Sequence, residues 1–253
     1  MLDVRIDRKD YSGRVSNSAP FQALQDFHFQ IEDGQFACLI GPSGCGKSTL
    51  LNIIGGLDRQ FAGQVMLDGH IPDGDIGYMF QSPRLMPWLT VIDNVKLVLP
   101  DTSTADQRAR ELLTAMALDD VLDAYPNRLS GGMQRRVALA RAFATEPKLL
   151  LMDEPFISLD APAAGRLRAM LIELWQRRRT KVLFVTHDLR EALALGDKVM
   201  FMTASPGRII LEKTIELPRP RTVDDAEIAA LHARLLGQHP QLLSGELDTD
   251  LPT

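Results

Sequence analysis

A glycine-rich run that follows a short apolar segment has the clearest chemistry in this sequence. It reads Gly-Pro-Ser-Gly-Cys-Gly-Lys-Ser and fits the pattern G-x-x-x-x-G-K-[ST] of a phosphate-binding loop. Residues with little or no side chain let successive backbone N–H groups approach an anionic triphosphate closely. We therefore expect a triphosphate to bind to the following residues: Gly41, Pro42, Ser43, Gly44, Cys45, Gly46, Lys47, Ser48 and Thr49.

Two side chains at the end of this loop have defined roles in such chemistry. Lys47 is expected to reach the β- and γ-phosphates as a point charge, and the Ser48 hydroxyl is expected to be a ligand of Mg²⁺. The apolar run 36–40 before the loop is typical of a buried strand, and residues 49–54 after it predict a helix. The N-terminus of that helix adds its positive dipole end to the phosphate site.

A pair of acidic residues follows a second apolar run, at residues 149–152. A carboxylate at the end of a buried strand, here Asp153, can hold Mg²⁺ through water. Its neighbour Glu154 is expected to orient or deprotonate the attacking water, because phosphoryl transfer depends on positioning and charge stabilisation. The pair predicts hydrolysis of the bound triphosphate.

Two further polar residues stand at the ends of predicted strands. His187 follows the apolar run 181–186 at the end where the nucleotide is expected, and it is assigned to the γ-phosphate. Gln81 follows the run 76–80, and its amide can contact both Mg²⁺ and the attacking water, with a surface-loop role as the alternative. A structural role is expected for the other histidines, His28, His70, His232 and His239.

A second anion site is predicted at Ser130, Gly131 and Gly132. These residues offer a hydroxyl and open backbone amides at the start of a predicted helix. A single copy of the fold has no room to place both anion sites on the same γ-phosphate. The sequence alone therefore leaves open which phosphate this second site would bind.

The ordered motifs of the chain resemble those of ABC-type ATPases from about residue 11 to residue 215. The run Leu129-Ser-Gly-Gly-Met-Gln134 resembles the signature motif, and Leu149-Leu-Leu-Met-Asp-Glu-Pro155 resembles Walker B. Three shorter pieces resemble the glutamine loop, the D-loop and the switch-histidine loop: residues 79–81, 158–160 and 185–188. The D-loop departs from the usual Ser-Ala-Leu-Asp, since the chain has Ile157-Ser-Leu-Asp160.

The resemblance implies ATP and Mg²⁺ as ligands and a head-to-tail pair of subunits, in which the signature of one subunit closes over ATP held by the other. It assigns nucleotide contacts to Gln134 and Asp160 in addition to the signature residues 130–132. The adenine of ATP usually stacks on an aromatic residue near the N-terminus of these proteins. Tyr11 is the first choice and Phe21 the alternative, because the turn-rich run 12–20 leaves the register open.

The segment after Gln81 places Leu, Met, Pro and Trp in a predicted loop, which suggests a contact surface, with core packing of Leu85 and Trp88 as the alternative. It is similar to the segment of importer ATPases of the nitrate, sulfonate and taurine group that cradles a helix of the permease. The resemblance implies a membrane permease bound near Arg84–Trp88, indirectly a periplasmic solute-binding protein, and a location at the cytoplasmic face of the bacterial inner membrane. Residues 206–209 and Leu217-Pro-Arg-Pro-Arg221 fit the same group.

The elements that position these residues predict an α/β fold of the phosphate-loop ATPase type, with a mainly parallel sheet and flanking helices, an antiparallel β sub-domain and an inserted helical sub-domain. We expect one nucleotide-binding domain over residues 1–217, with the helical sub-domain at about 84–145. Residues 218–253 are expected to form a C-terminal extension with one amphipathic helix around Ile228, Leu231 and Leu235.

The composition agrees with a globular enzyme: 253 residues, 45% of them apolar, and a formal net charge of −5. The acidic balance speaks against nucleic acid, and no apolar run is long enough to span a bilayer. The leading hypothesis is the ATP-hydrolysing subunit of an importer of a small solute, such as a sulfonate or nitrate. The alternatives are a soluble ABC ATPase of DNA repair or translation and a non-catalytic assembly subunit, the latter opposed by Glu154 and His187.

Overall fold

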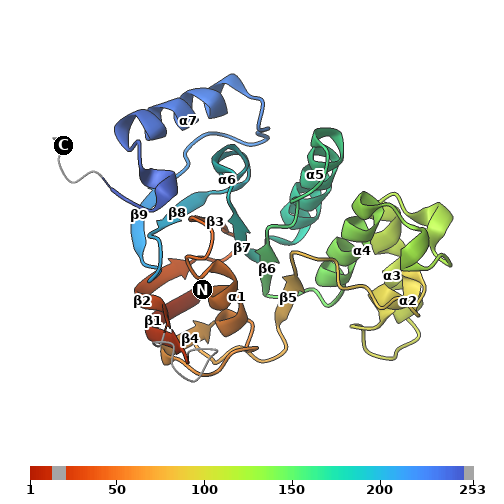
Figure 1. The fold of residues 1–253 in the computed structure, drawn as a ribbon. Helices are drawn as coiled ribbons and strands as arrows, with labels where there is room; N and C mark the ends of the chain where they lie inside the picture. Colours follow the sequence, from red (N-terminus) through yellow and green to blue (C-terminus); the bar gives the residue numbers. More distant parts are fainter. Residues whose placement is uncertain (13–20, 248–253) are drawn as a thin grey trace. The chain divides into compact units, whose positions relative to one another are not determined.

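A computed structural model describes residues 1–12 and 21–247. The predicted turn-rich run at residues 12–20 lies outside the described residues, apart from Ser12. The chain divides into two compact units (Figure 1). The first unit comprises residues 1–74 together with the chain from residue 181 onward, and the second comprises residues 75–180.

The first unit contains an antiparallel sheet of β1 (Leu2–Tyr11), β2 (Phe21–Ile31) and β4 (Ala62–Leu67), in the order β2-β1-β4. Alternate residues of β2, including Phe27, Phe29 and Ile31, are buried, as the period of two predicted. β4 ends in a tight turn whose residues Asp68 and Gly69 both have positive φ, 52° and 82°. Asp and Gly are residue types that tolerate positive φ, which explains this turn.

The second sheet of this unit has the strand order β7-β3-β8-β9. β3 (Phe36–Ile40) runs parallel to both β7 (Lys181–Thr186) and β8 (Lys198–Met202), and β9 (Ile209–Thr214) runs antiparallel to β8. Every residue of β3 and β7 is buried, which explains their continuous apolar sequences. The ligand-binding end of these parallel strands is where their carboxyl termini, Ile40 and Thr186, lie in register.

The helices of the first unit lie in the connections between these strands and in the C-terminal extension. They are α1 (Lys47–Ile54), α6 (Leu189–Leu195), α7 (Ala226–Gln238) and the short 3-10 helix η3 (Leu242–Ser244). α7 packs against α6, and its buried residues Ile228, Leu231 and Leu235 are those of the predicted amphipathic helix (Figure 1).

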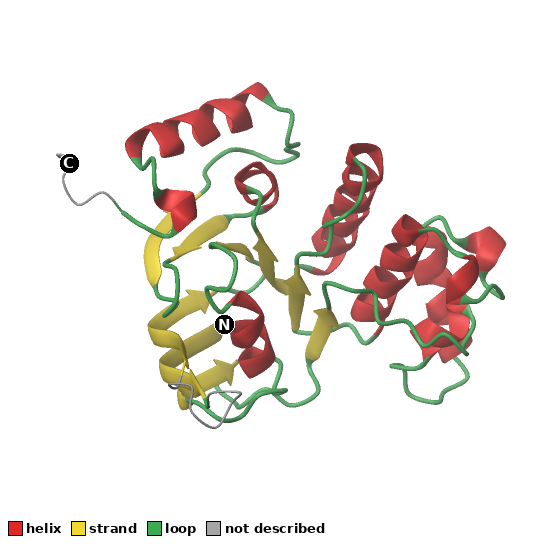
Figure 2. Cartoon of the chain, viewed as in Figure 1, coloured by secondary structure: helices red, strands yellow, loops and turns green. Residues whose placement is uncertain are grey.

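The second unit combines a parallel strand pair with most of the described helices. β5 (Ile76–Met79) pairs with β6 (Leu149–Asp153), and α5 (Ala161–Arg178) follows β6. The connection between the two strands contains α2 (Val91–Lys96), α3 (Ala105–Ala115), η1 (Asp119–Val121), η2 (Pro126–Arg128) and α4 (Gly131–Ala144), and it has no described strand (Figure 2). This connection is the segment whose pattern was helical in the sequence.

The α/β architecture predicted from the sequence is confirmed, with a mainly parallel sheet, a separate antiparallel sheet and helices. By its residue type Thr104 is a candidate side-chain cap of α3, but its hydroxyl caps no amide of the first turn. Thr104 stands at the N-cap position, but its backbone is already helical and its hydroxyl bonds with that of Thr102. A capping side chain needs an extended backbone to reach back to the first-turn amides. None of the described helices is long and apolar enough to cross a membrane.

Candidate functional site

The phosphate-binding loop connects the buried strand β3 to α1 in the first unit. α1 begins after Gly46, which has φ of 102° and has no side chain that could cap the first-turn amides. A Cβ atom at Gly46 would lie 2.9 Å from the backbone oxygen of Ala23 and 2.8 Å from the side chain of Leu24. Both the conformation and the space therefore require glycine here. No acidic residue occupies the first turn of α1, which suits an anionic ligand.

The ammonium group of Lys47 lies inside this loop. Lys47 Nζ donates hydrogen bonds to the backbone oxygens of Gly41, at 2.7 Å, and Pro42, at 2.9 Å. Only 8% of the residue is exposed. The loop's own carbonyl groups therefore hold the positive charge within the loop, and the contact of Lys47 with phosphate oxygens stays a prediction.

The loop is supported from behind by a second loop, residues 203–208. Gly207 exchanges backbone hydrogen bonds with β2, donating to Ala23 at 2.9 Å and accepting from Gln25 at 3.1 Å. A Cβ atom at Gly207 would lie 2.3 Å from the backbone oxygen of Cys45, so the two loops are in direct contact. The thiol of Cys45 is buried 3.9 Å from the sulfur of Met202, and burial raises its pKa. Cys45 is accordingly a small packing residue rather than a reactive thiol.

Both candidates for the adenine-stacking aromatic lie at the same end of the antiparallel sheet. Tyr11 and Phe21 are register partners on β1 and β2, and they are 38% and 49% exposed. The Tyr11 hydroxyl lies 3.3 Å from the hydroxyl of Thr49 in α1, which links this ring to the helix behind the phosphate loop. The ammonium of Lys9 lies 4.5 Å from the centre of the same ring. These contacts favour Tyr11, whose role in binding adenine stays a prediction.

His187 stands between β7 and α6, and its side chain is exposed. The residues on both sides of it are fixed to α6: the Thr186 hydroxyl donates to Glu191 Oε2 at 2.7 Å, and Asp188 caps the helix by accepting from the amides of Arg190 and Glu191. β7 ends beside β3, so the structure places His187 at the same end of the sheet as the phosphate loop.

The two acids of the second unit have different surroundings. Asp153, the last residue of β6, is 9% exposed, while Glu154 is half-buried and has a positive φ of 43°. This conformation is uncommon for a residue with a side chain and is often found at functional sites. Burial and the nearby charge of Asp153 raise the pKa of Tyr78, which lies on the neighbouring strand β5.

The signature segment forms the start of α4. Ser130 is the N-cap, and its hydroxyl accepts a hydrogen bond from the amide of Met133 at 3.3 Å. Gly131 is exposed, and a Cβ atom there would have no neighbour within 4 Å. The amide of Gln134 donates to the backbone oxygens of Pro126 and Leu129, which places this side chain in an internal role. A nucleotide contact of Gln134 therefore stays a prediction that the geometry does not favour.

The remaining predicted site residues of the second unit are at the surface. Gln81 is exposed and lies two residues after the end of β5, and Asp160 is the exposed N-cap of α5, where it accepts from the amide of Ala163 at 2.7 Å. The structure therefore gives Asp160 a helix-capping role, and its predicted contact with nucleotide stays a prediction.

Buried polar residues that hold these loops were not identified from the sequence. Arg135 in α4 donates to the backbone oxygens of Gln81, Pro155 and Ile157, at 2.9, 2.8 and 2.7 Å. Arg141, two turns later, donates to the backbone oxygens of Pro83 and Arg84. The feature of the sequence that could have identified them is an arginine on the apolar side of a predicted helix. A charged group buried there needs several hydrogen-bond acceptors.

The predicted contact segment contains one prominent exposed residue. Trp88 is 70% exposed, while Leu85 and Met86 are half-buried. The fully buried Asn94 in α2 holds the segment through Met86, whose amide it binds at 2.7 Å and whose carbonyl it binds at 3.2 Å. Core packing of Trp88 is therefore excluded, and its exposure agrees with a contact surface.

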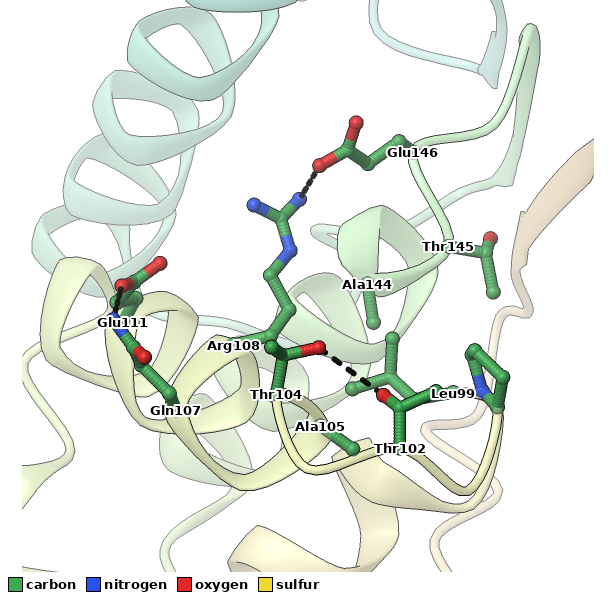
Figure 3. A pocket seen from close by; sticks show the side chains of 11 residues that line it. Leu99, Thr102, Thr104, Ala105, Gln107, Arg108, Glu111, Ala144, Thr145 and Glu146 are labelled. Carbon is green, nitrogen blue, oxygen red and sulfur yellow. Dashed lines mark hydrogen bonds and ion pairs between the residues drawn. The ribbon is translucent and has the colours of Figure 1, made fainter.

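A pocket of about 440 Å³ in the second unit is a different feature (Figure 3). It lies among α3, the loop before it and the end of α4. Its charged groups are paired, since Arg108 binds Glu146 at 2.8 Å and Gln107 binds Glu111 at 3.0 Å. None of the predicted site residues lines it, and it offers no cluster of unpaired positive charge for a phosphate.

Comparison with known proteins identifies one family and several related proteins. Residues 24–157 match the ABC transporter family. The chain is 44% identical over 96% of its length to the aliphatic sulfonates import ATP-binding protein SsuB 2 of Burkholderia lata, of which it covers 87%. It is 42% identical over 86% of its length to the SsuB protein of Bacillus cereus, of which it covers 88%.

A solved structure of an ATP-binding cassette is also similar to this chain. The dimeric structure of the ATP-binding cassette MJ0796 in a post-hydrolysis state bound to ADP and Pi matches 86% of this chain and all of its own, with a TM-score of 0.75 and 32% sequence identity. The phosphate loop after β3, the acid pair at the end of β6 and the signature at the start of α4 occupy the positions in the secondary structure that the sequence predicted. The chain belongs to the ATP-binding proteins of the ABC transporter family.

Proposed function

We propose that this protein binds and hydrolyses ATP to drive an importer of a small anionic solute, with an aliphatic sulfonate as the first candidate. The observation that carries the ATP-binding part is the phosphate loop with the Lys47 ammonium held inside it. The transport part is supported by the relatives at 40–44% identity, which are named import ATP-binding proteins for aliphatic sulfonates.

In this proposal the first unit binds the nucleotide. Lys47 and the first-turn amides of α1 bind the β- and γ-phosphates, because a cation and a helix N-terminus both favour negative charge. The residues 41–46, apart from Pro42, supply further backbone N–H groups, and Thr49 follows in the first turn of α1. Tyr11 stacks on the adenine, with Phe21 as the alternative, and His187 contacts the γ-phosphate.

Mg²⁺ fits the donor set that the chain offers. The oxygen ligands proposed are the Ser48 hydroxyl, the Asp153 carboxylate and the Gln81 amide, which are hard donors of the kind Mg²⁺ prefers. Among the described residues no group of three histidine, cysteine or acidic side chains forms a metal cage. Few protein ligands are expected for Mg²⁺, which keeps waters and substrate phosphates around it. When bound, it neutralises charge on the phosphates.

Hydrolysis is assigned to Glu154, which would hold the attacking water in line with the γ-phosphate and accept its proton. The half-buried position and the positive φ of Glu154 support a specialised role. Glu154 also argues against a non-catalytic assembly subunit. The soluble ABC ATPase alternative is not favoured, since the relatives are transporter subunits.

The complete site is proposed to need two copies of the chain, paired head to tail. Ser130, Gly131 and Gly132 of one copy would close over ATP bound by the other, with Gln134 and Asp160 near the same nucleotide. The first-turn amides of α4 and the exposure of Gly131 support this role. The similar solved ATP-binding cassette MJ0796 is dimeric.

The partner in the membrane is proposed to be a permease that docks near Arg84–Trp88, where Trp88 is exposed. The protein would thus lie at the cytoplasmic face of the bacterial inner membrane, with a periplasmic solute-binding protein as an indirect partner. We assign residues 1–217 to one nucleotide-binding domain, with its helical part at about 84–145, and residues 218–253 to a C-terminal extension.

The test compares the wild type with Glu154→Gln. We expect Glu154→Gln to bind ATP with Mg²⁺ as tightly as the wild type and to lose most of its turnover, by at least about a hundredfold. Equal turnover of the two proteins would remove Glu154 from the mechanism. The transport part is tested separately, by co-purification with a candidate permease in detergent. Trp88→Ala should weaken that co-purification without changing ATP binding, and retained co-purification would argue against this docking surface.

A further inference from the structure

The segment Leu217-Pro-Arg-Pro-Arg221, which connects β9 to α7, brings two arginines to the C-terminal end of α6. Arg221 donates from Nη2 to the backbone oxygen of Gly196 at 2.7 Å and from Nε to that of Ala194 at 3.1 Å. Arg219 donates to the backbone oxygen of Leu195. Three consecutive carbonyl groups at the end of α6 are thus bound by this one segment.

These contacts suit the chemistry of a helix end. The last carbonyl groups of a helix have no partner within the helix, and a cation there interacts favourably with the helix dipole. Arg221 is half-buried, and this burial lowers the pKa of its guanidinium. The hydrogen bonds are therefore shielded from solvent and stronger than those of a surface arginine.

Arg219 extends the same support to the strand that leads into the phosphate loop. Its Nη2 lies 2.7 Å from Asp197 Oδ1, and Asp197 Oδ2 accepts a hydrogen bond at 2.9 Å from the amide of Phe36, the first residue of β3. The backbone amide of Asp197 in turn donates to the Phe36 oxygen at 2.7 Å. The segment is tied both to α6 and to the start of β3.

The other end of α6 carries His187. The residue precedes the N-cap Asp188, and its neighbour Thr186 is hydrogen-bonded to Glu191 within the helix. α6 has seven residues, and all of them except Arg190 are buried. A buried helix of this length spans about 10 Å and moves as one body. A shift at its C-terminal end is therefore transmitted to the backbone at His187.

We propose that Arg219 and Arg221 are positioning residues for His187, acting through α6, so that the segment 217–221 contributes to hydrolysis. The extension covers α6 from outside through α7, whose apolar face packs on it (Figure 1). The proposal rests on the proposed function insofar as His187 contacts the γ-phosphate. The alternative is that the extension only stabilises the fold. The test must distinguish this alternative from the positioning of His187.

The first arm is a double-mutant cycle in the full-length protein. We expect Arg221→Ala to lower kcat for ATP about ten- to a hundredfold with little change in KM, because misplacing a reacting group by about 1 Å has effects of this size. Arg221→Lys should recover part of the loss. In a His187→Ala background, Arg221→Ala should change kcat less than about twofold, because the imidazole that Arg221 positions is absent. The control is Arg234→Ala, an exposed arginine of α7, which should leave kcat unchanged.

The second arm does not depend on hydrolysis. The imidazole C–H signal of His187 is identified in NMR spectra by its loss in His187→Ala, and it should shift or broaden in Arg221→Ala, while the signal of His28 on β2 stays in place. A His187 signal that does not change, or an equal loss of kcat in both backgrounds of the cycle, would each overturn the proposal. If the wild type lacks ATPase activity, the proposed function fails, and the NMR arm still decides whether Arg221 positions His187.

Discussion

Arg135 Nη1 lies 2.9 Å from the backbone oxygen of Gln81, so the helix that follows the signature holds the glutamine loop directly. The same guanidinium binds the backbone oxygens of Pro155 and Ile157, just after the acid pair. One side chain thus links three segments that the proposed function assigns to the metal, to the attacking water and to the second subunit. This link is rigid because the arginine is only 8% exposed and binds three carbonyl groups.

Replacing Arg135 by methionine keeps much of the side-chain volume and removes all three donors. We expect Arg135→Met to lower the free energy of unfolding by about 2 to 4 kcal/mol, because buried carbonyl groups lose charged partners. Urea unfolding measures the loss, and the exposed Arg128→Ala in the same unit serves as the control. A variant as stable as the wild type would show that these hydrogen bonds contribute nothing net.

We predict that Asn94 holds the backbone of the contact segment near Arg84–Trp88 in place. Its amide donates to the backbone oxygens of Met86, Leu89 and Thr90, and its oxygen accepts from the amide of Met86. We expect Asn94→Leu to speed hydrogen exchange of the Met86 amide by at least about tenfold, because this amide loses its acceptor. Thr104→Ala, at the start of α3, is the control, since its hydroxyl does not cap the helix. Unchanged exchange at Met86 would contradict the role of Asn94.

Gly207 predicts a steric effect on nucleotide binding. A methyl group there would approach the backbone oxygen of Cys45 to 2.3 Å, so the phosphate loop or the supporting loop must move. We expect Gly207→Ala to weaken ATP binding by at least about fivefold in calorimetric titration, because the loop amides leave their positions.

The matched control for this variant is Gly237→Ala, in α7. A methyl group at Gly237 meets no atom within 4 Å, and alanine is the better helix former by about 1 kcal/mol. Gly237→Ala should therefore leave ATP affinity unchanged and raise the melting temperature slightly. Equal affinities of the Gly207 and Gly237 variants would show that the contact with Cys45 does not shape the loop.

Asp33 contributes to the pH dependence of the free energy of unfolding. Hydrogen bonding to Lys181, followed by that to the amino group of Met1, lowers the pKa of Asp33 to about 2 from its ordinary value of 3.8. A lowered folded-state pKa means that the contribution is complete above about pH 4 and is lost as the pH falls toward 2. Asp33 is 79% exposed, so solvent screening keeps the contribution below about 1 kcal/mol.

Urea unfolding of the wild type and Asp33→Asn checks this expectation. At neutral pH the variant should be less stable by up to about 1 kcal/mol, and the difference should shrink between about pH 4 and pH 2 and in high salt. The exposed Asp7→Asn on β1 is the control. A difference that grows as the pH falls would have the wrong sign for this account.

The sequence predicted the parts of the fold that depend on local pattern. The continuous apolar runs became buried strands, and the glycine-rich loop lies between β3 and α1, because strand burial and the steric demands of glycine are both local properties. The helix around Ile228, Leu231 and Leu235 also followed from its period.

The contacts that hold the site depend on tertiary structure instead. Arg135, Arg221 and Gly207 act on backbone atoms far away in the chain, and a backbone carbonyl leaves no mark in the sequence. The choice between Tyr11 and Phe21 was open for a related reason: the two are cross-strand partners, so both lie at the same place. Thr104 failed as a cap because its backbone conformation was decided by the preceding turn.

The central claim is that hydrolysis needs the signature of a second copy of the chain. The most direct test mixes two inactive variants, Glu154→Gln and Gly131→Asp. Gly131→Asp should fold, since the position is open and an acid suits the first turn of α4, but its charge repels the γ-phosphate. A mixed dimer of the head-to-tail kind contains one wild-type site, so an equimolar mixture should recover about a quarter of wild-type turnover. Activity that stays at the sum of the two separate variants would contradict the composite site.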